Sequence, residues 1–76
     1  MTKKVEIYSR SNCSYCVMAM KFFDSKGIKY DVYSADDQKV FEEILERNPQ
    51  ARTVPHIFID DQLLGGYTDL VDNYSD

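Results

Sequence analysis

The chain contains two cysteines, Cys13 and Cys16, separated by only two residues. Small polar residues precede the pair, and a stretch without Gly or Pro follows it as far as Lys26. This pattern places Cys13 at the N-terminus of a helix, where unpaired N–H groups and the helix dipole favour a thiolate. Cys16 lies one turn further on the same face, close enough for a short disulfide. The pair is therefore typical of thiol–disulfide exchange, in which one thiolate attacks and a second thiol resolves.

Three other interpretations of the cysteines have to be weighed against this one. They could be small buried hydrophobes, but their spacing and their place between a strand and a helix disfavour that reading. A structural zinc site needs four ligands. The sequence offers only Cys13, Cys16 and His56 as soft or borderline candidates, so a carboxylate would have to join them. A cysteine nucleophile of the protease kind needs a base and an orienting group, for which one histidine leaves little room.

Segments with strand and helix patterns alternate around the cysteine pair. Val5 and Ile7 alternate with polar neighbours, as in a strand. Apolar side chains between Cys16 and Phe23 recur at helical spacing, and Gly27 suits the C-terminal end of that helix. The narrow apolar stripe of a second helix consists of Val40, Phe41, Ile44 and Leu45.

These patterns predict one α/β domain over residues 1–76, with the element order βαβαββα. The elements are a strand over 4–8, a helix from 13 or 14 to 26, a strand over 28–33, a helix between the caps at 34–37 and Asn48-Pro49, a strand over 55–59, a short strand that ends at 65–66, and one or two helical turns from Tyr67. Strands that alternate with helices indicate a layered α/β domain. The first connection suits a crossover between parallel strands, and the last two strands suit a hairpin.

Composition and charge exclude several classes of protein. Nine Lys and Arg residues against thirteen Asp and Glu residues give a net charge of −4, whereas nucleic-acid binders are usually basic. No stretch approaches the ~20 apolar residues of a membrane span, and residues 1–6 lack the apolar segment of a signal peptide. We therefore expect a cytoplasmic protein with no nucleic-acid partner and no membrane association. The acidic residues after Arg52 are expected to form a solvated surface.

Three separated motifs resemble those of one protein family. They are Cys13-Ser14-Tyr15-Cys16, Thr53-Val54-Pro55 and Gly65-Gly66-Tyr67-Thr68-Asp69-Leu70. In this order and spacing they resemble the glutaredoxins, which are small thiol–disulfide oxidoreductases of the thioredoxin superfamily that use glutathione. The resemblance extends over residues 5–70. It implies a minimal thioredoxin fold, in which three helices surround a four-stranded mixed sheet.

The resemblance also implies an activity, the reduction of protein disulfides and glutathione mixed disulfides. Cys13 would be the nucleophile and Cys16 the resolving thiol. Glutathione would be the co-substrate, oxidised or glutathionylated proteins would be the partners, and a monomer is expected. One alternative is an electron donor that thioredoxin reductase reduces, for example one that serves ribonucleotide reductase.

A second alternative is a carrier of a [2Fe–2S] cluster. Some glutaredoxins with Ser or Gly in place of the usual Pro of the cysteine motif bind such a cluster between two subunits, and Ser14 stands at that position here. Cys13 would then be the protein ligand, because thiolates suit iron. Otherwise no metal is expected.

The same resemblance implies where glutathione binds. Pro55 would be cis and face the cysteines, so that Val54 offers its backbone N–H and C=O to the peptide. A trans proline that opens a strand is the ordinary alternative. Gly66 would let the backbone approach the ligand. Thr68 would meet the γ-glutamyl carboxylate and Asp69 the ammonium group, although both could equally be ordinary helix caps.

Basic and aromatic residues would complete the glutathione site. Arg10, Gln50 and Arg52 match family positions that meet the glycyl carboxylate, to which arginine is well suited; solvated surface charges are the alternative. Positive charge at Arg10 would also favour the Cys13 thiolate. The full set implied to bind glutathione is Arg10, Tyr15, Gln50, Arg52, Thr53, Val54, Pro55, Gly66, Thr68 and Asp69. The aromatic residues assigned to the core instead are Tyr8, Phe23 and Phe58.

Overall fold

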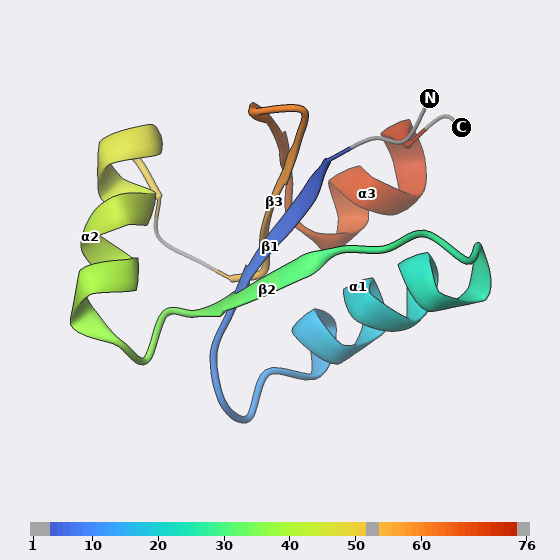
Figure 1. Ribbon diagram of the computed structural model, residues 1–76, viewed down its shortest axis with the longest axis horizontal. Coiled ribbons are helices and arrows are strands. Elements are labelled where there is room, and N and C mark those ends of the chain that lie inside the picture. Colours follow the sequence, from blue (N-terminus) through green and yellow to red (C-terminus); the bar gives the residue numbers. More distant parts are fainter. Residues whose placement is uncertain (1–3, 52–53, 75–76) are drawn as a thin grey trace.

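The computed structural model describes residues 4–51 and 54–74 and contains seven elements in the predicted order (Figure 1). They are β1 (Val5–Ser9), α1 (Ser14–Ser25), β2 (Asp31–Ser34), α2 (Gln38–Arg47), β3 (His56–Ile59), β4 (Gln62–Gly65) and α3 (Tyr67–Asn73). The order βαβαββα is therefore confirmed. Within the described residues, every helix is too short or too polar to cross a lipid bilayer.

The four strands form one mixed sheet in the order β2-β1-β3-β4. β1 runs parallel to β2 and antiparallel to β3, and β3 runs antiparallel to β4. α1 and α3 lie on one face of this sheet, and α2 covers the other (Figure 1). The predicted fold is thus confirmed. Because β1 and β2 run in the same direction, the segments that follow them meet at the same edge of the sheet, and Cys13 follows β1 at that edge.

The central strands contribute to a core on each face of the sheet. One core cluster lies beneath α1 and α3 and consists of Val5, Ile7, Ala19, Phe23, Ile57 and Leu70. The other lies beneath α2 and consists of Tyr8, Ala35, Ile44 and Phe58. Successive side chains of a strand point to opposite faces, so the neighbours Ile7 and Tyr8 belong to different clusters. The three aromatic residues predicted for the core are all buried, which confirms that assignment.

The predicted start of the second strand is wrong. The second strand is expected over residues 28–33, but β2 begins only at Asp31. Ile28 and Tyr30 instead pack, partly buried, against the cluster beneath α1 and α3, so their apolar character reflects packing before the strand begins. Within the apolar stripe of α2, Ile44 is buried in the cluster beneath the helix, whereas Phe41 is 44% exposed.

A polar network lies inside the face that α2 covers. Glu6 is the second residue of β1 and is only 6% exposed. Arg47, the last residue of α2, donates to Glu6 Oε1 at 3.2 Å and to the Tyr8 hydroxyl at 3.0 Å. Its guanidinium carbon lies 3.7 Å from the centroid of the Phe58 ring, and Tyr8 donates to Glu43 Oε1 at 2.8 Å. These bonds explain how a central strand carries a buried carboxylate.

Replacing Arg47 by alanine should lower the free energy of unfolding by about 2–3 kcal/mol. The variant leaves the Glu6 carboxylate buried without its cation and removes the group that covers the Phe58 ring. The expected loss stays below that of a fully buried pair because 21% of the Arg47 side chain is exposed. Urea denaturation measures the change. Glu46→Ala, on the exposed side of α2, is the control and should change stability by less than about 0.5 kcal/mol; equal losses would contradict the role of the network.

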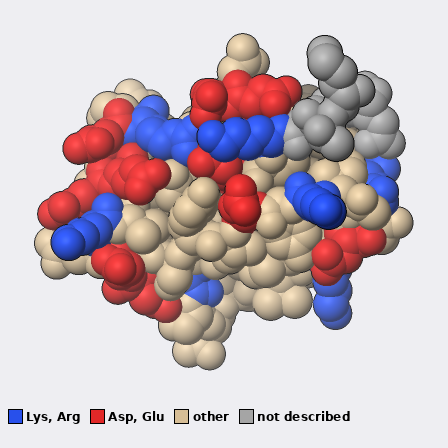
Figure 2. Space-filling view, viewed as in Figure 1, with Lys and Arg blue, Asp and Glu red and all other residues tan. Residues whose placement is uncertain are grey.

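Charged side chains of both signs share the surface over α2. Figure 2 shows acidic side chains gathered toward this end of the molecule, with Lys and Arg side chains between them. Asp61, one of the acidic residues after Arg52, lies 3.8 Å from Lys4 and 3.5 Å from Arg47. Asp60 accepts a hydrogen bond from the Lys4 backbone at 2.9 Å. Asp60 and Asp61 are therefore exposed, as predicted, but both interact with neighbouring groups.

Candidate active site

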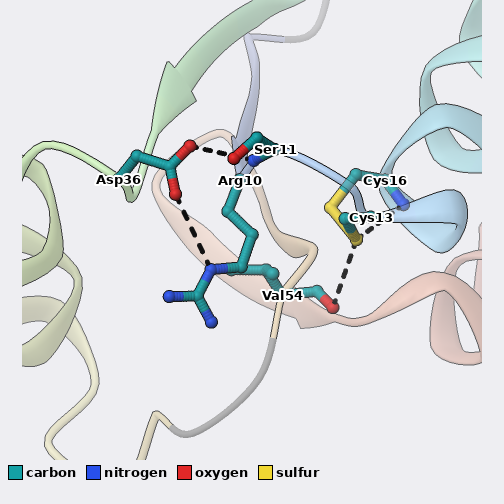
Figure 3. The surroundings of a disulfide bond; sticks show 6 residues. All are labelled: Arg10, Ser11, Cys13, Cys16, Asp36 and Val54. Atoms are coloured by element: carbon teal, nitrogen blue, oxygen red, sulfur yellow. Dashed lines mark hydrogen bonds and ion pairs between the residues drawn. A yellow bond between two sulfur atoms is a disulfide. The ribbon is translucent and has the colours of Figure 1, made fainter.

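Cys13 lies at the junction between the loop after β1 and the start of α1. It is the N-cap residue of α1, and its Sγ accepts a hydrogen bond from the Cys16 backbone N–H at 3.2 Å. The two Cα atoms are 5.3 Å apart, and the two sulfur atoms form a disulfide (Figure 3). Cys16 is buried, whereas Cys13 is partly exposed. The predicted position of the pair is confirmed, and Cys13 rather than Cys16 is placed to meet an incoming sulfur.

The segment before β3 faces the cysteines. The Val54–Pro55 peptide bond is cis, as the resemblance implies, so the trans alternative is wrong. The carbonyl oxygen of Val54 lies 3.9 Å from Cys13 Sγ (Figure 3). A peptide that paired with Val54 in the manner of a strand would therefore run past Cys13. Arg52 and Thr53 lie outside the described residues, and their roles stay predictions.

The third motif forms the corner where β4 passes into α3. Gly65 has a φ of +122°, and a Cβ atom at Gly66 would lie 3.5 Å from the carbonyl oxygen of Pro55. The corner therefore packs next to the cis-proline segment. Asp69 Oδ2 accepts a hydrogen bond from the Gly66 N–H at 3.1 Å, so this carboxylate caps α3. Thr68 and Asp69 are exposed, and a cap that uses one oxygen is compatible with a contact between Asp69 and an ammonium group.

Replacing Gly65 by alanine should destabilise the fold by roughly 2–3 kcal/mol. Its φ of +122° strains any L side chain, and the new Cβ would overlap the Asp69 carboxylate. Gly27→Ala is the matched control, because Gly27 also has a positive φ of +69° but its added Cβ would meet nothing within 4 Å. It should lose about 1 kcal/mol. Thermal unfolding of both variants measures the difference, and equal losses would show that the Asp69 contact imposes no constraint.

Arg10 lies beside the cysteine loop and is paired with Asp36. The Oδ1 atom of Asp36 is 3.9 Å from Arg10 Nε, and its Oδ2 atom accepts a hydrogen bond from the Ser11 backbone N–H at 2.9 Å (Figure 3). The hydrogen bond from Ser11 and, less strongly, the charge of Arg10 hold the pKa of Asp36 below its usual value. Contact of Arg10 with glutathione stays a prediction.

The predictions treat Asp36 only as one of several helix caps. In the structure Asp37 caps α2, accepting from the Lys39 N–H at 2.9 Å, and Asp36 reaches across to the cysteine loop instead. A signal for this contact exists in the sequence. Parallel strands end at the same edge, so a carboxylate directly after the second strand lies near the loop that follows the first.

An aromatic pair connects the cysteine motif with α3. Tyr15 is 59% exposed, and its ring centroid lies 6.0 Å from that of Tyr67. Tyr67 is not among the residues predicted to bind glutathione. Its position within the third motif was the signal in the sequence that could have identified it. Gln50 lies exposed in the turn after α2, where its N–H donates to Asn48 Oδ1 at 3.2 Å. The predicted contacts of Tyr15 and Gln50 with glutathione stay predictions.

The zinc alternative has no ligand set in residues 4–51 and 54–74, where no three His, Cys, Asp or Glu side chains group around a common point. His56 is buried, and its Nε2 lies 3.2 Å from the side-chain nitrogen of Asn48. Its ring also lies 6.5 Å from the centroid of Phe58, a residue of the cluster beneath α2. His56 is therefore part of the packing on that face of the sheet.

The second motif lies beside the Cys13 sulfur, and the third motif adjoins the second. A thiolate there would have the N-terminus of α1 behind it and the Val54 carbonyl beside it. The corner at Gly66 adjoins the same segment. This arrangement suits nucleophilic exchange with a sulfur atom on an extended peptide.

Comparisons of the sequence with known proteins agree on one family. The family model described as Glutaredoxin matches residues 5–64. A probable glutaredoxin of Synechocystis is 37% identical over 71 residues, which cover 92% of this chain and 81% of the relative. Glutaredoxin 3 of Escherichia coli K12 is 38% identical over 66 residues, which cover 87% of this chain and 80% of the relative.

Comparisons of the structure agree with those of the sequence. Glutaredoxin 1 from Francisella tularensis, solved in complex with cacodylate, superposes with a TM-score of 0.81 at 37% identity, covering 95% of this chain and 92% of that one. A buckwheat glutaredoxin–glutathione complex superposes with a TM-score of 0.79 at 27% identity, covering 92% of this chain and 66% of that one.

Proposed function

This chain belongs to the glutaredoxin family of thiol–disulfide oxidoreductases, and we propose that its reductant is glutathione. Its substrates would be glutathione mixed disulfides and protein disulfides. The observation that carries the proposal is the contact between Cys13 Sγ and the carbonyl oxygen of Val54 at 3.9 Å, with the capped corner at Gly66 next to the same segment. The likeness to a glutaredoxin solved with glutathione supports the choice of this tripeptide.

The proposed reduction of a glutathione mixed disulfide takes place at Cys13 alone. Its thiolate attacks the glutathionyl sulfur of a mixed disulfide, so that a new bond joins Cys13 to glutathione while the old disulfide breaks. The substrate sulfur leaves as a thiolate and takes up a proton from solvent. A second glutathione thiolate then attacks the glutathionyl sulfur, which yields glutathione disulfide and restores the Cys13 thiolate.

Protein disulfides would follow a route that needs both cysteines. Cys13 attacks one sulfur of the protein disulfide and forms a mixed disulfide with the substrate. Cys16, 5.3 Å away between Cα atoms, then attacks Cys13 and releases the reduced protein. The resulting Cys13–Cys16 bond, the state that the structure contains, returns to the dithiol at the expense of two glutathiones, which leave as glutathione disulfide.

The residues around Cys13 would contribute by placing the tripeptide. The backbone of Val54 would pair with the cysteine residue of glutathione, and the Asp69 carboxylate would bind its ammonium group. Thr68, exposed at the start of α3, would meet the γ-glutamyl carboxylate. Such positioning brings the two reacting sulfurs together before exchange, which supplies a large part of the rate.

A coupled assay tests the choice of reductant. The protein is mixed with glutathione, glutathione reductase, NADPH and a small glutathione mixed disulfide, and in parallel with thioredoxin reductase and the same substrate. The proposal predicts NADPH oxidation that depends on this protein only in the glutathione system. Turnover only with thioredoxin reductase would favour the alternative of a thioredoxin-reductase-fed electron donor.

The cluster alternative stays a prediction that rests on Ser14 and Cys13. Cys13 is partly exposed and would supply one thiolate ligand, and the remaining ligands would have to come from glutathione and a second copy of the chain. Anaerobic reconstitution with iron, sulfide and glutathione should yield a brown dimer on gel filtration if the chain binds a cluster. A colourless monomer would contradict the idea and would agree with the monomer proposed for the reductase.

A further inference from the structure

Asp36 extends the connection between β1 and β2 beyond their last paired residues. The parallel ladder ends at Ser9 and Ser34, after which the Ala35 N–H donates to the Ser9 carbonyl at 2.6 Å. Beyond that point a side chain replaces the backbone, since Asp36 Oδ2 accepts from the Ser11 N–H at 2.9 Å. The carboxylate thus holds the chain where it leaves the sheet.

The segment held in this way leads directly to the nucleophile. Ser11 is followed by Asn12, whose φ of +59° lies in the left-handed region, and then by Cys13, the N-cap of α1. An L residue other than glycine enters that region at a cost. A bond that fixes the neighbouring Ser11 therefore helps to keep the turn in the conformation that presents Cys13.

Asp36 is itself held in place from the other side. Its N–H lies 3.3 Å from the Ser34 hydroxyl, and the next residue, Asp37, is fixed as the cap of α2. The Oδ1 atom of Asp36 faces Arg10 Nε, and the two terminal nitrogens of the Arg10 guanidinium point away from Asp36 (Figure 3). Because both partners of this pair are about half exposed, at 59% and 46%, the ion pair contributes little, and the bond to Ser11 is the stronger restraint.

We propose that Asp36 is a positioning residue, which holds the Ser11–Cys13 turn in the conformation that presents the Cys13 sulfur for exchange. The inference rests on the proposed function for its substrate, but it concerns the presentation of Cys13 whatever the reductant. Asp36 touches neither the reacting sulfur nor the substrate in this account. The Ser11 bond requires an acceptor oxygen and not a charge, so an amide side chain can replace the carboxylate, whereas a methyl group cannot.

Three variants separate the hydrogen bond from the charge. Asp36→Ala removes both, Asp36→Asn keeps an acceptor oxygen but removes the charge, and Asp37→Asn removes the same charge one residue away while keeping a good N-cap. Asp36→Ala should lower kcat/KM for a glutathione mixed disulfide by about five- to tenfold, the scale of one lost hydrogen bond. The two asparagine variants should stay within about twofold of the unchanged protein.

A second readout does not involve glutathione. The reduced proteins carry Cys16→Ser, and the rate at which iodoacetamide alkylates Cys13 is followed against pH. Asp36→Ala and Asp36→Asn have the same net charge, so only the Ser11 bond separates them. The alanine variant should show a higher pH midpoint than the asparagine variant, because a less ordered turn presents the sulfur less well to the helix N-terminus.

The two readouts keep the inference and the proposed function apart. Rescue by asparagine in the alkylation profile supports the positioning role even if the unchanged protein turns over no glutathione substrate. Equal alkylation profiles for Asp36→Ala and Asp36→Asn would overturn the inference. If Asp36→Asn lowered kcat/KM as much as Asp36→Ala, the inference would be overturned too. The charge of Asp36, and not its hydrogen bond with Ser11, would then account for the loss.

Discussion

Replacing Cys13 by serine should remove all turnover, whereas Cys16→Ser should keep the reduction of glutathione mixed disulfides and lose the reduction of protein disulfides. Cys13 is the partly exposed N-cap of α1, and Cys16 is buried behind it. A serine hydroxyl cannot act as the exchanging sulfur, so the loss at Cys13 should be about three orders of magnitude or more. The coupled assay with both substrate types measures the two activities.

Comparison of the two substrates provides the control for this prediction. Cys16→Ser should lose only the dithiol route, because in the proposed reaction glutathione itself resolves the glutathionylated Cys13. If both variants lost activity equally on the mixed disulfide, Cys16 would be more than a resolving thiol and the assignment of Cys13 as the sole nucleophile would be wrong.

Replacing Asp69 by alanine should raise the KM for glutathione or a glutathionylated substrate by roughly ten- to a hundredfold, because the variant would lose the proposed charge-assisted contact with the ammonium group. The value of kcat should change little, since Cys13 and its helix are left in place. Steady-state kinetics at varied glutathione concentration measure both constants.

The cap that Asp69 forms with the Gly66 N–H calls for a second variant. Asp69→Asn keeps an oxygen that can cap α3 but removes the negative charge. A raised KM in both variants would identify the charge as the binding feature. If Asp69→Asn kept the KM of the unchanged protein while Asp69→Ala raised it, loss of the helix cap would account for the effect. The contact with the ammonium group would then be excluded.

Local patterns in the sequence were sufficient to predict the elements that position the site. The helix that follows Cys13 has no Gly or Pro before Gly27, and the helix that precedes Asn48-Pro49 ends there because the residue before a proline leaves the helical region. The start of β2 was predicted less well. Ile28 resembles a strand residue because it is apolar, but its side chain packs against α1 and α3 without strand pairing.

Contacts between distant residues account for most of what the sequence did not reveal. The burial of Glu6 depends on Arg47, which lies 41 positions away. Likewise, the contact between Asp36 and Ser11 depends on two parallel strands ending together. The cysteines and the cis proline were predicted because each belongs to a short motif. The residues that hold those motifs in place lie elsewhere in the chain, and only the fold brings them near.

One measurement tests the central claim, that Cys13 exchanges sulfur with glutathione. The reduced Cys16→Ser variant is mixed with glutathione disulfide, and its intact mass is recorded before and after glutathione is added in excess. We expect a single glutathione adduct on Cys13 that the added glutathione removes. A Cys16→Ser variant that forms no adduct, or an adduct that persists in excess glutathione, would contradict it.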